Sequence, residues 1–141
     1  MDQSFHMTDL YVEGPGVMDF VSSLAVNSFA KFGDSRAKQF IACAPDGHLI
    51  GDMIIFGLGE NLVNIVGRPT VANWVEYNAS LGQFDVTCDR DERSLQNPKA
   101  RKTFRFELQG PSAWALLEKL NGGAIEQPRF FQMGHLSVSG R

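Results

Sequence analysis

An apolar stretch interrupted by turn residues, residues 45–68, sets the strongest limit on what this chain can fold into. Asp46-Gly47 predicts a tight turn, because glycine accepts the positive φ that such a turn demands. Apolar runs over 49–58 and 62–66 then predict two long strands, with small and polar residues marking the turn between them. A hairpin this apolar needs helices or strands on both faces to cover it.

The segments before the hairpin alternate between strand and helix patterns. Residues 7–13 alternate loosely as a strand, which Gly14-Pro15 ends. Apolar residues at helical spacing follow over 17–24, and residues 39–44 predict a short strand that enters the hairpin.

The segments after the hairpin supply further candidate elements. Pro69 suits the first turn of a helix, which Gly82 ends. The remaining predictions are a strand over 84–88, an exposed polar loop over 89–101, an alternating strand over 102–109, a helix over 113–120 and a final strand over 130–138.

The order strand, Gly-Pro, amphipathic helix occurs twice, at 10–26 and at 104–120. A diverged duplication of one strand–helix unit would produce this pattern. We therefore predict one domain over residues 1–141 with an α+β fold, in which helices pack on one side of a mostly antiparallel sheet.

Composition excludes several classes of protein. The chain has 141 residues, of which 43% are hydrophobic and 21% charged, as in a soluble globular domain. A net charge of −3 argues against a nucleic-acid surface, and no apolar run reaches the roughly 18 residues of a membrane span. Residues 1–10 have neither the basic region nor the apolar region typical of a signal peptide, and Cys43 and Cys88 predict two reduced thiols, so we expect a cytoplasmic protein.

No motif in the chain predicts a metal, phosphate or serine-nucleophile site. The histidines at 6, 48 and 135 lack zinc-ligand spacing, Gly14-x-Gly16 lacks a third glycine, and there is no G-x-S-x-G elbow. We therefore expect no metal centre.

Three features remain as candidate binding groups, each with an alternative. An amide and an imidazole, Gln3 and His6, stand just before the first strand and could bind a polar ligand, or they could belong to a solvated terminus. Arg68 could clamp a carboxylate bidentately, or form an ordinary surface ion pair. Asp52 could be a general acid or base whose pKa burial raises, or it could lie on the wet side of a half-buried strand.

Several co-linear blocks resemble a known family. They are DQSFHM at 2–7, DGHLIGD at 46–52, VGR at 66–68 followed by ANW at 72–74, and FELQGPSAWALLEKLNGG at 106–123. Together they resemble the aminomethyltransferase (glycine cleavage T-protein) family. Within it they are most similar to the tetrahydrofolate-dependent O-demethylases of the vanillate and syringate type.

The resemblance implies a function and a set of roles. It implies transfer of a methyl group from a methoxylated aromatic acid to N5 of tetrahydrofolate, with no assignment of the folate-binding residues. Gln3 and His6 would line the aromatic substrate pocket and Arg68 would hold the substrate carboxylate. His6 and Asp52 are the candidate catalytic groups, although the resemblance gives Asp52 no defined role.

Two departures from the family keep alternatives open. The T-protein has two adjacent acids in this hairpin, whereas this chain has Gly51 in the first place, which counts against a glycine cleavage aminomethyltransferase. Family members also run to several hundred residues, so this chain resembles a partial first domain, and we expect weak or no turnover from it alone. The other alternative is a non-catalytic folate-binding module, or one that completes its fold by pairing with a second copy.

Overall fold

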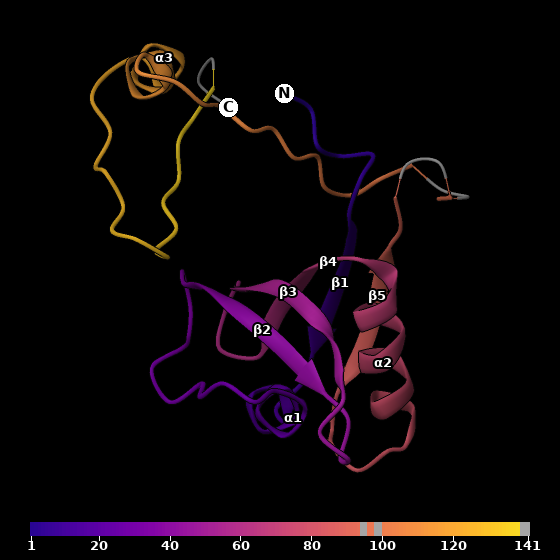
Figure 1. Ribbon diagram of the computed structural model, residues 1–141. Coiled ribbons are helices and arrows are strands. Elements are labelled where there is room, and N and C mark those ends of the chain that lie inside the picture. The colour runs from indigo at the N-terminus through magenta and orange to yellow at the C-terminus, as the bar shows by residue number, and fades with distance from the viewer. Residues whose placement is uncertain (94–95, 98–99, 139–141) are drawn as a thin grey trace.

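The computed structural model describes residues 1–93, 96–97 and 100–138, and its centre is a five-stranded antiparallel sheet (Figure 1). The strands lie in the order β2-β3-β4-β1-β5. Their bounds are β1 Thr8–Glu13, β2 Ala37–Cys43, β3 Leu49–Gly57, β4 Leu62–Gly67 and β5 Thr87–Asp91. The helices are α1 Val17–Leu24, α2 Pro69–Ser80 and α3 Ala113–Asn121.

Two tight turns build the centre of the sheet, as the sequence predicts. Between β2 and β3, Gly47 adopts a φ of 87° and donates its backbone N–H to the carbonyl of Ala44 over 2.9 Å. Between β3 and β4, the N–H of Leu58 donates to the carbonyl of Leu62 over 3.0 Å. The predicted hairpin is therefore confirmed as β3 and β4.

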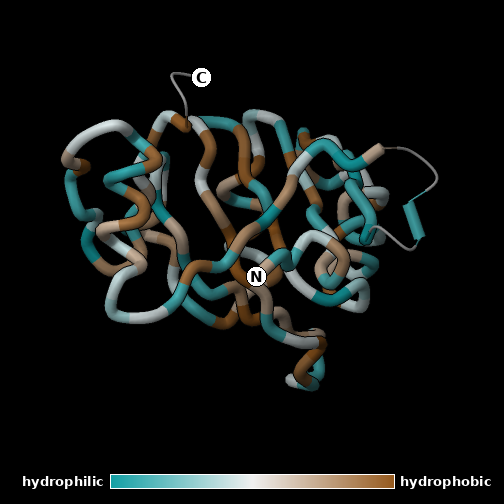
Figure 2. The backbone as a smooth tube through the Cα atoms, turned by 90° about the horizontal axis from the view of Figure 1, so that it is seen from above, coloured by the Kyte–Doolittle hydropathy of each residue, from teal (hydrophilic) through white to brown (hydrophobic). Residues whose placement is uncertain are grey.

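The hydrophobic core lies between one face of the sheet and the helices α1 and α2. Alternate residues of the strands point into it. Hydrophobic stretches of the chain pass through the middle of the molecule (Figure 2). The helices complete the core with Val17, Phe20, Val21 and Leu24 of α1 and Val71, Ala72 and Val75 of α2. This arrangement confirms the α+β fold with helices on one side of the sheet.

The third helix does not share in this core. No residue of α3 is buried, and Figure 1 shows it standing apart from the sheet. Its bounds agree with the predicted helix over 113–120 to within one residue, and it ends at Gly122, which adopts the left-handed conformation with a φ of 81°.

The polar segment after α2 differs from the prediction. The last strand of the sheet, β5, begins at Thr87 and pairs with β1, so the predicted strand over 84–88 is shifted along the chain and the predicted loop over 89–101 begins inside the sheet. The pairing places Asp91 opposite Asp9, where both carboxyl groups are buried and receive hydrogen bonds. Residues 94, 95, 98 and 99 lie outside the described residues.

The strands predicted over 102–109 and 130–138 are not strands of the sheet. Residues 102–109 are extended but form a single isolated bridge, between Asp2 and Phe106, and residues 130–138 form one between Arg36 and Gln132. The alternation over 102–109 does exist, but the polar side chains face the domain and the phenylalanines face outward.

Candidate functional site

A cavity of about 670 Å³ lies where the N-terminal segment, the hairpin and the start of α2 meet. Its walls are formed by His6 and Met7, by residues 50–54 of β3, by Val66, Gly67 and Arg68, and by Thr70 and Val71. Three of the four site residues predicted from the sequence, His6, Asp52 and Arg68, therefore border one hollow.

Arg68 stands directly between β4 and α2. Pro69 occupies the first position of the helix and favours an extended conformation for the residue before it, and Arg68 accordingly has φ −79° and ψ 147°. The guanidinium is exposed and forms no ion pair with the residues that the structure describes. An arginine in this state can receive the carboxylate of a ligand through two parallel hydrogen bonds.

Asp52 lies on β3 with its side chain exposed, in agreement with the wet-side alternative. One carboxylate oxygen accepts a hydrogen bond of 2.9 Å from Nε2 of Gln39 on the neighbouring strand. Asp52 therefore presents a solvated negative charge at the same cavity as Arg68.

The N-terminal segment delivers His6 to the cavity but directs Gln3 elsewhere. Nε2 of Gln3 donates to a carboxylate oxygen of Glu107 over 2.8 Å, and Gln3 is absent from the cavity wall. The backbone N–H of His6 donates to the carbonyl of Gln3 over 3.3 Å, and the imidazole is exposed. A substrate contact from Gln3 would require its amide to leave Glu107.

Close contact with α2 explains why residue 51 in the hairpin is a glycine. A Cβ atom on Gly51 would come within 2.8 Å of Cγ2 of Val71 on α2, and the φ of Gly51 is +154°. A larger residue would therefore push against the start of the helix that follows Arg68. The sequence holds no local signal for this contact, because 20 residues separate its partners.

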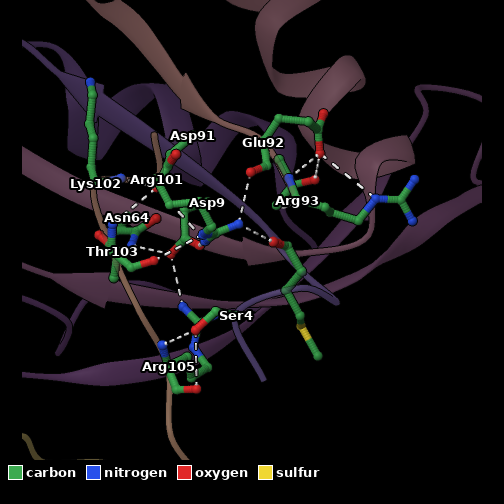
Figure 3. Close-up of polar contacts among 12 residues, drawn as sticks. Ser4, Asp9, Asn64, Asp91, Glu92, Arg93, Arg101, Lys102, Thr103 and Arg105 are labelled. Carbon is green, nitrogen blue, oxygen red and sulfur yellow. Dashed lines mark hydrogen bonds and ion pairs between the residues drawn. The ribbon is translucent and has the colours of Figure 1, made fainter. Parts of the chain in front are cut away.

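A cluster of polar side chains gathers around the buried carboxylates of Asp9 and Asp91 (Figure 3). Asp9 is fully buried and accepts hydrogen bonds from Arg101 over 2.6 Å, Arg105 over 2.8 Å and Asn64 over 2.9 Å. Asp91 accepts the backbone N–H groups of Lys102 and Thr103, over 3.0 and 3.1 Å.

This cluster fixes the position of the N-terminus. Arg101 also donates to the carbonyl of Met7 over 3.1 Å, one residue beyond His6, and the N–H of Arg105 donates to Oγ of Ser4 over 2.8 Å. Its function is therefore to hold the segment that borders the cavity, and no local motif marks it in the sequence.

The described residues contain no group of three or more histidine, cysteine or acidic side chains placed to hold a metal ion. Cys43 and Cys88 are free thiols; burial, with the Glu76 carboxylate adding to it, raises the pKa of Cys88 to about 11. Within the same residues, no helix has the length and apolar character needed to cross a bilayer.

Comparison with known proteins places the chain in a family. The GCVT N-terminal domain model matches residues 1–141, so this chain belongs to that family. It is 40% identical over 141 residues to syringate O-demethylase from a Sphingobium species and 25% identical over 130 residues to an aminomethyltransferase from Halothermothrix orenii. These matches cover 99% and 89% of this chain.

A solved structure supports the same fold. The glycine cleavage system aminomethyltransferase T from Bartonella henselae superposes with a TM-score of 0.67 over 93% of this chain, at 21% identity. In every one of these comparisons the chain spans only about a third of the other protein: 30% of the demethylase, 33% of the aminomethyltransferase and 34% of the solved chain.

Proposed function

We propose that this chain forms part of a tetrahydrofolate-dependent methyl transfer protein that demethylates a methoxylated aromatic acid. The observation that carries the proposal is the single cavity bordered by His6, Asp52 and Arg68, with an arginine that lacks an ionic partner among the described residues. The 40% identity to a syringate O-demethylase over the whole chain supports this substrate class.

The cavity fits an aromatic acid in size and chemistry. Its volume of about 670 Å³ is in the range of small-molecule sites, and Met53, Ile54 and Val66 offer apolar surface for a ring. Arg68 at the rim would fix the carboxylate and so orient the ring and its methoxy group.

The reaction must expel a phenolate, which leaves far more readily when its oxygen is protonated. His6 is the side chain at the cavity whose ordinary pKa lies near neutrality, so it can supply or relay that proton. Asp52 borders the same cavity, where its carboxylate can accept a proton or a hydrogen bond. When bound, tetrahydrofolate supplies the nitrogen that accepts the methyl group.

Binding of syringate and of its uncharged methyl ester tests the role of Arg68. The chain should bind syringate more tightly than the ester, and Arg68→Ala should weaken syringate binding about tenfold or more while leaving the ester unchanged. Arg36→Ala, an exposed arginine at another part of the molecule, is the matched control and should change neither affinity. Equal affinity of the native chain for acid and ester would remove Arg68 from the substrate site.

Formation of methyl-tetrahydrofolate separates an enzyme from a folate-binding module. We expect little turnover from this chain with syringate and tetrahydrofolate, because it spans 30% of the demethylase that it matches. Rapid demethylation by the chain alone would contradict the proposal that the rest of such a protein is needed. The glycine cleavage reaction is the weaker candidate, because Gly51 occupies the place of the acid and a Cβ atom there would come within 2.8 Å of Cγ2 of Val71.

A further inference from the structure

The extended segment 102–109 faces the domain with its polar side. Thr103 hydrogen-bonds to the hydroxyl of Tyr11, Arg105 reaches the buried carboxylate of Asp9, and Glu107 accepts the amide of Gln3. The intervening residues, Phe104 and Phe106, are therefore turned outward, and their exposed fractions are 65% and 66%. Leu108 follows them at 40%.

The backbone of this segment is paired on one side. The carbonyl of Arg105 accepts the N–H of Gln3, and the N–H of Glu107 donates to the carbonyl of Met1, each over 2.8 Å. Successive residues of an extended chain point their backbone groups to opposite sides. The N–H and C=O groups of Phe104, Phe106 and Leu108 accordingly face away from the N-terminal segment, and they form no hydrogen bond with the described residues.

An open strand edge with a row of apolar side chains is a site for adding another strand. Unpaired backbone groups give such an edge its affinity and alternate side chains give it specificity. The segment 104–108 combines both features, and the polar contacts on its other side hold it in an extended conformation in advance. Pre-ordering of this kind lowers the entropy cost of binding.

The exposed apolar surface continues along the chain. No residue of α3 is buried, although its sequence is amphipathic, and Leu116 and Leu120 are exposed. A monomer rarely leaves such a succession of large apolar side chains in water. A partner that covers the open edge would also be placed to cover this helix, which begins only five residues after Leu108.

We propose that segment 104–108 is a docking edge for a β-strand of the polypeptide that makes up the rest of the related proteins. The syringate O-demethylase matches 99% of this chain with 30% of its own length, so about two thirds of it has no counterpart here to lie against. This proposal concerns assembly and is independent of which substrate the cavity binds.

Amide exchange with a defined partner tests the proposal. The partner is the part of the Sphingobium syringate O-demethylase outside the matched stretch, produced separately and mixed with isotope-labelled chain. We expect the amides of Phe104, Phe106 and Leu108 to exchange about tenfold or more slowly after mixing. The amides of Arg105 and Glu107 already donate hydrogen bonds within the chain and should change less.

A double variant provides the matched comparison. Phe104→Ser with Phe106→Ser should weaken binding about tenfold or more and leave the melting temperature of the chain itself nearly unchanged, because both side chains are exposed. Val26→Ser, which alters an equally exposed residue far from this edge in sequence, should leave binding unchanged.

Three results would overturn the proposal. The first is that a folded partner does not slow amide exchange in segment 104–108. The second is that exchange slows equally at all five amides of this segment. The third is that the chain forms a concentration-dependent dimer, which the double variant abolishes. The last result would assign the edge to a second copy. If the partner does not fold alone, joining it in frame to this chain decides the question: the double variant should then lower the melting temperature of the joined protein but not of the chain.

Discussion

Asp9 is a fully buried carboxylate whose negative charge is balanced by Arg101 and Arg105. The side chain of Arg101 is itself only 3% exposed, so removing Asp9 takes away its nearer carboxylate, at 2.6 Å, and leaves this buried cation with Asp91 alone, at 3.8 Å. We expect Asp9→Ala to lower the free energy of unfolding by about 3–5 kcal/mol, measured by urea denaturation. Asp89→Ala breaks the exposed pair with Lys102 and should have little effect. If Asp9→Ala lowered the free energy of unfolding as little as Asp89→Ala does, the buried cluster would not stabilise the fold.

The carboxyl group of Glu92 makes the stability of this region depend on pH. Burial opposes its ionisation, but hydrogen bonds from Thr8 and from the N–H of Arg93, together with the Arg90 guanidinium, outweigh burial and lower the pKa of Glu92. A carboxyl whose pKa is lower in the folded state stabilises the fold above its unfolded pKa, about 4.5, and loses that contribution as the pH falls through the folded value. Urea midpoints measured below pH 5 should therefore fall less steeply in Glu92→Gln than in the native chain. Parallel curves would contradict this role.

At the scale of the elements, the sequence predicts most of what packs against the core. The hairpin, β1, α1 and α2 follow from apolar periodicity and from Gly and Pro at the turns, because these elements bury one face against a common core. Periodicity predicts the alternation over 102–109 but not which side faces inward. The polar side faces inward because Arg101 and Arg105 hydrogen-bond to the buried carboxylate of Asp9. Asp9 lies 92 residues from Arg101 in sequence, so no local pattern predicts this contact.

In the candidate site, too, local sequence predicts some features but not those that depend on distant contacts. The blocks that resemble the family predict a substrate pocket with Gln3, His6 and Arg68, and the structure places His6 and Arg68, together with Asp52, at one cavity. The position of Gln3 could not be predicted, because it depends on a carboxylate from a segment 104 residues away. The contact between Gly51 and Val71 likewise arises only when α2 folds back on the hairpin.

The end of β3 carries a prediction about close packing. A Cβ atom on Gly57 would come within 2.0 Å of the carbonyl oxygen of Gly33, a backbone atom that cannot move aside cheaply. We expect Gly57→Ala to lower the free energy of unfolding, measured by urea denaturation, by at least about 1–3 kcal/mol. Gly59→Ala, two residues along in the same turn, meets nothing within 4 Å and should be close to neutral. A neutral Gly57→Ala would mean that the loop before β2 shifts freely.

At the scale of the whole molecule, the chain divides into a packed part and an exposed part. The buried hydrophobic residues lie between Leu10 and Val75, whereas no large apolar side chain after residue 103 is buried in the part of the chain that the structure describes. Segment 101–109 joins the two parts, with polar anchors on one side and an apolar surface on the other. The domain therefore holds its outer surface in place through buried charge and leaves the apolar side available to other polypeptide.

Shortening the chain from its C-terminus separates these two parts. A chain that ends at Gly110 keeps Arg101 and Arg105. It loses the described backbone hydrogen bonds of Phe131 with Ala37, at the start of β2, and of Met133 with Ser35, just before it. It should unfold cooperatively, at a cost of at most about 2 kcal/mol relative to residues 1–141. A chain that ends at Ala100 loses both arginines and leaves Asp9 buried and unbalanced, so it should lose about 3–5 kcal/mol or fail to fold. Urea curves of the three chains measure both steps. If the first shortening cost as much as the second, α3 and the residues after it would belong to the stabilising core, and the open edge at Phe104 and Phe106 would not be the outer boundary of the domain.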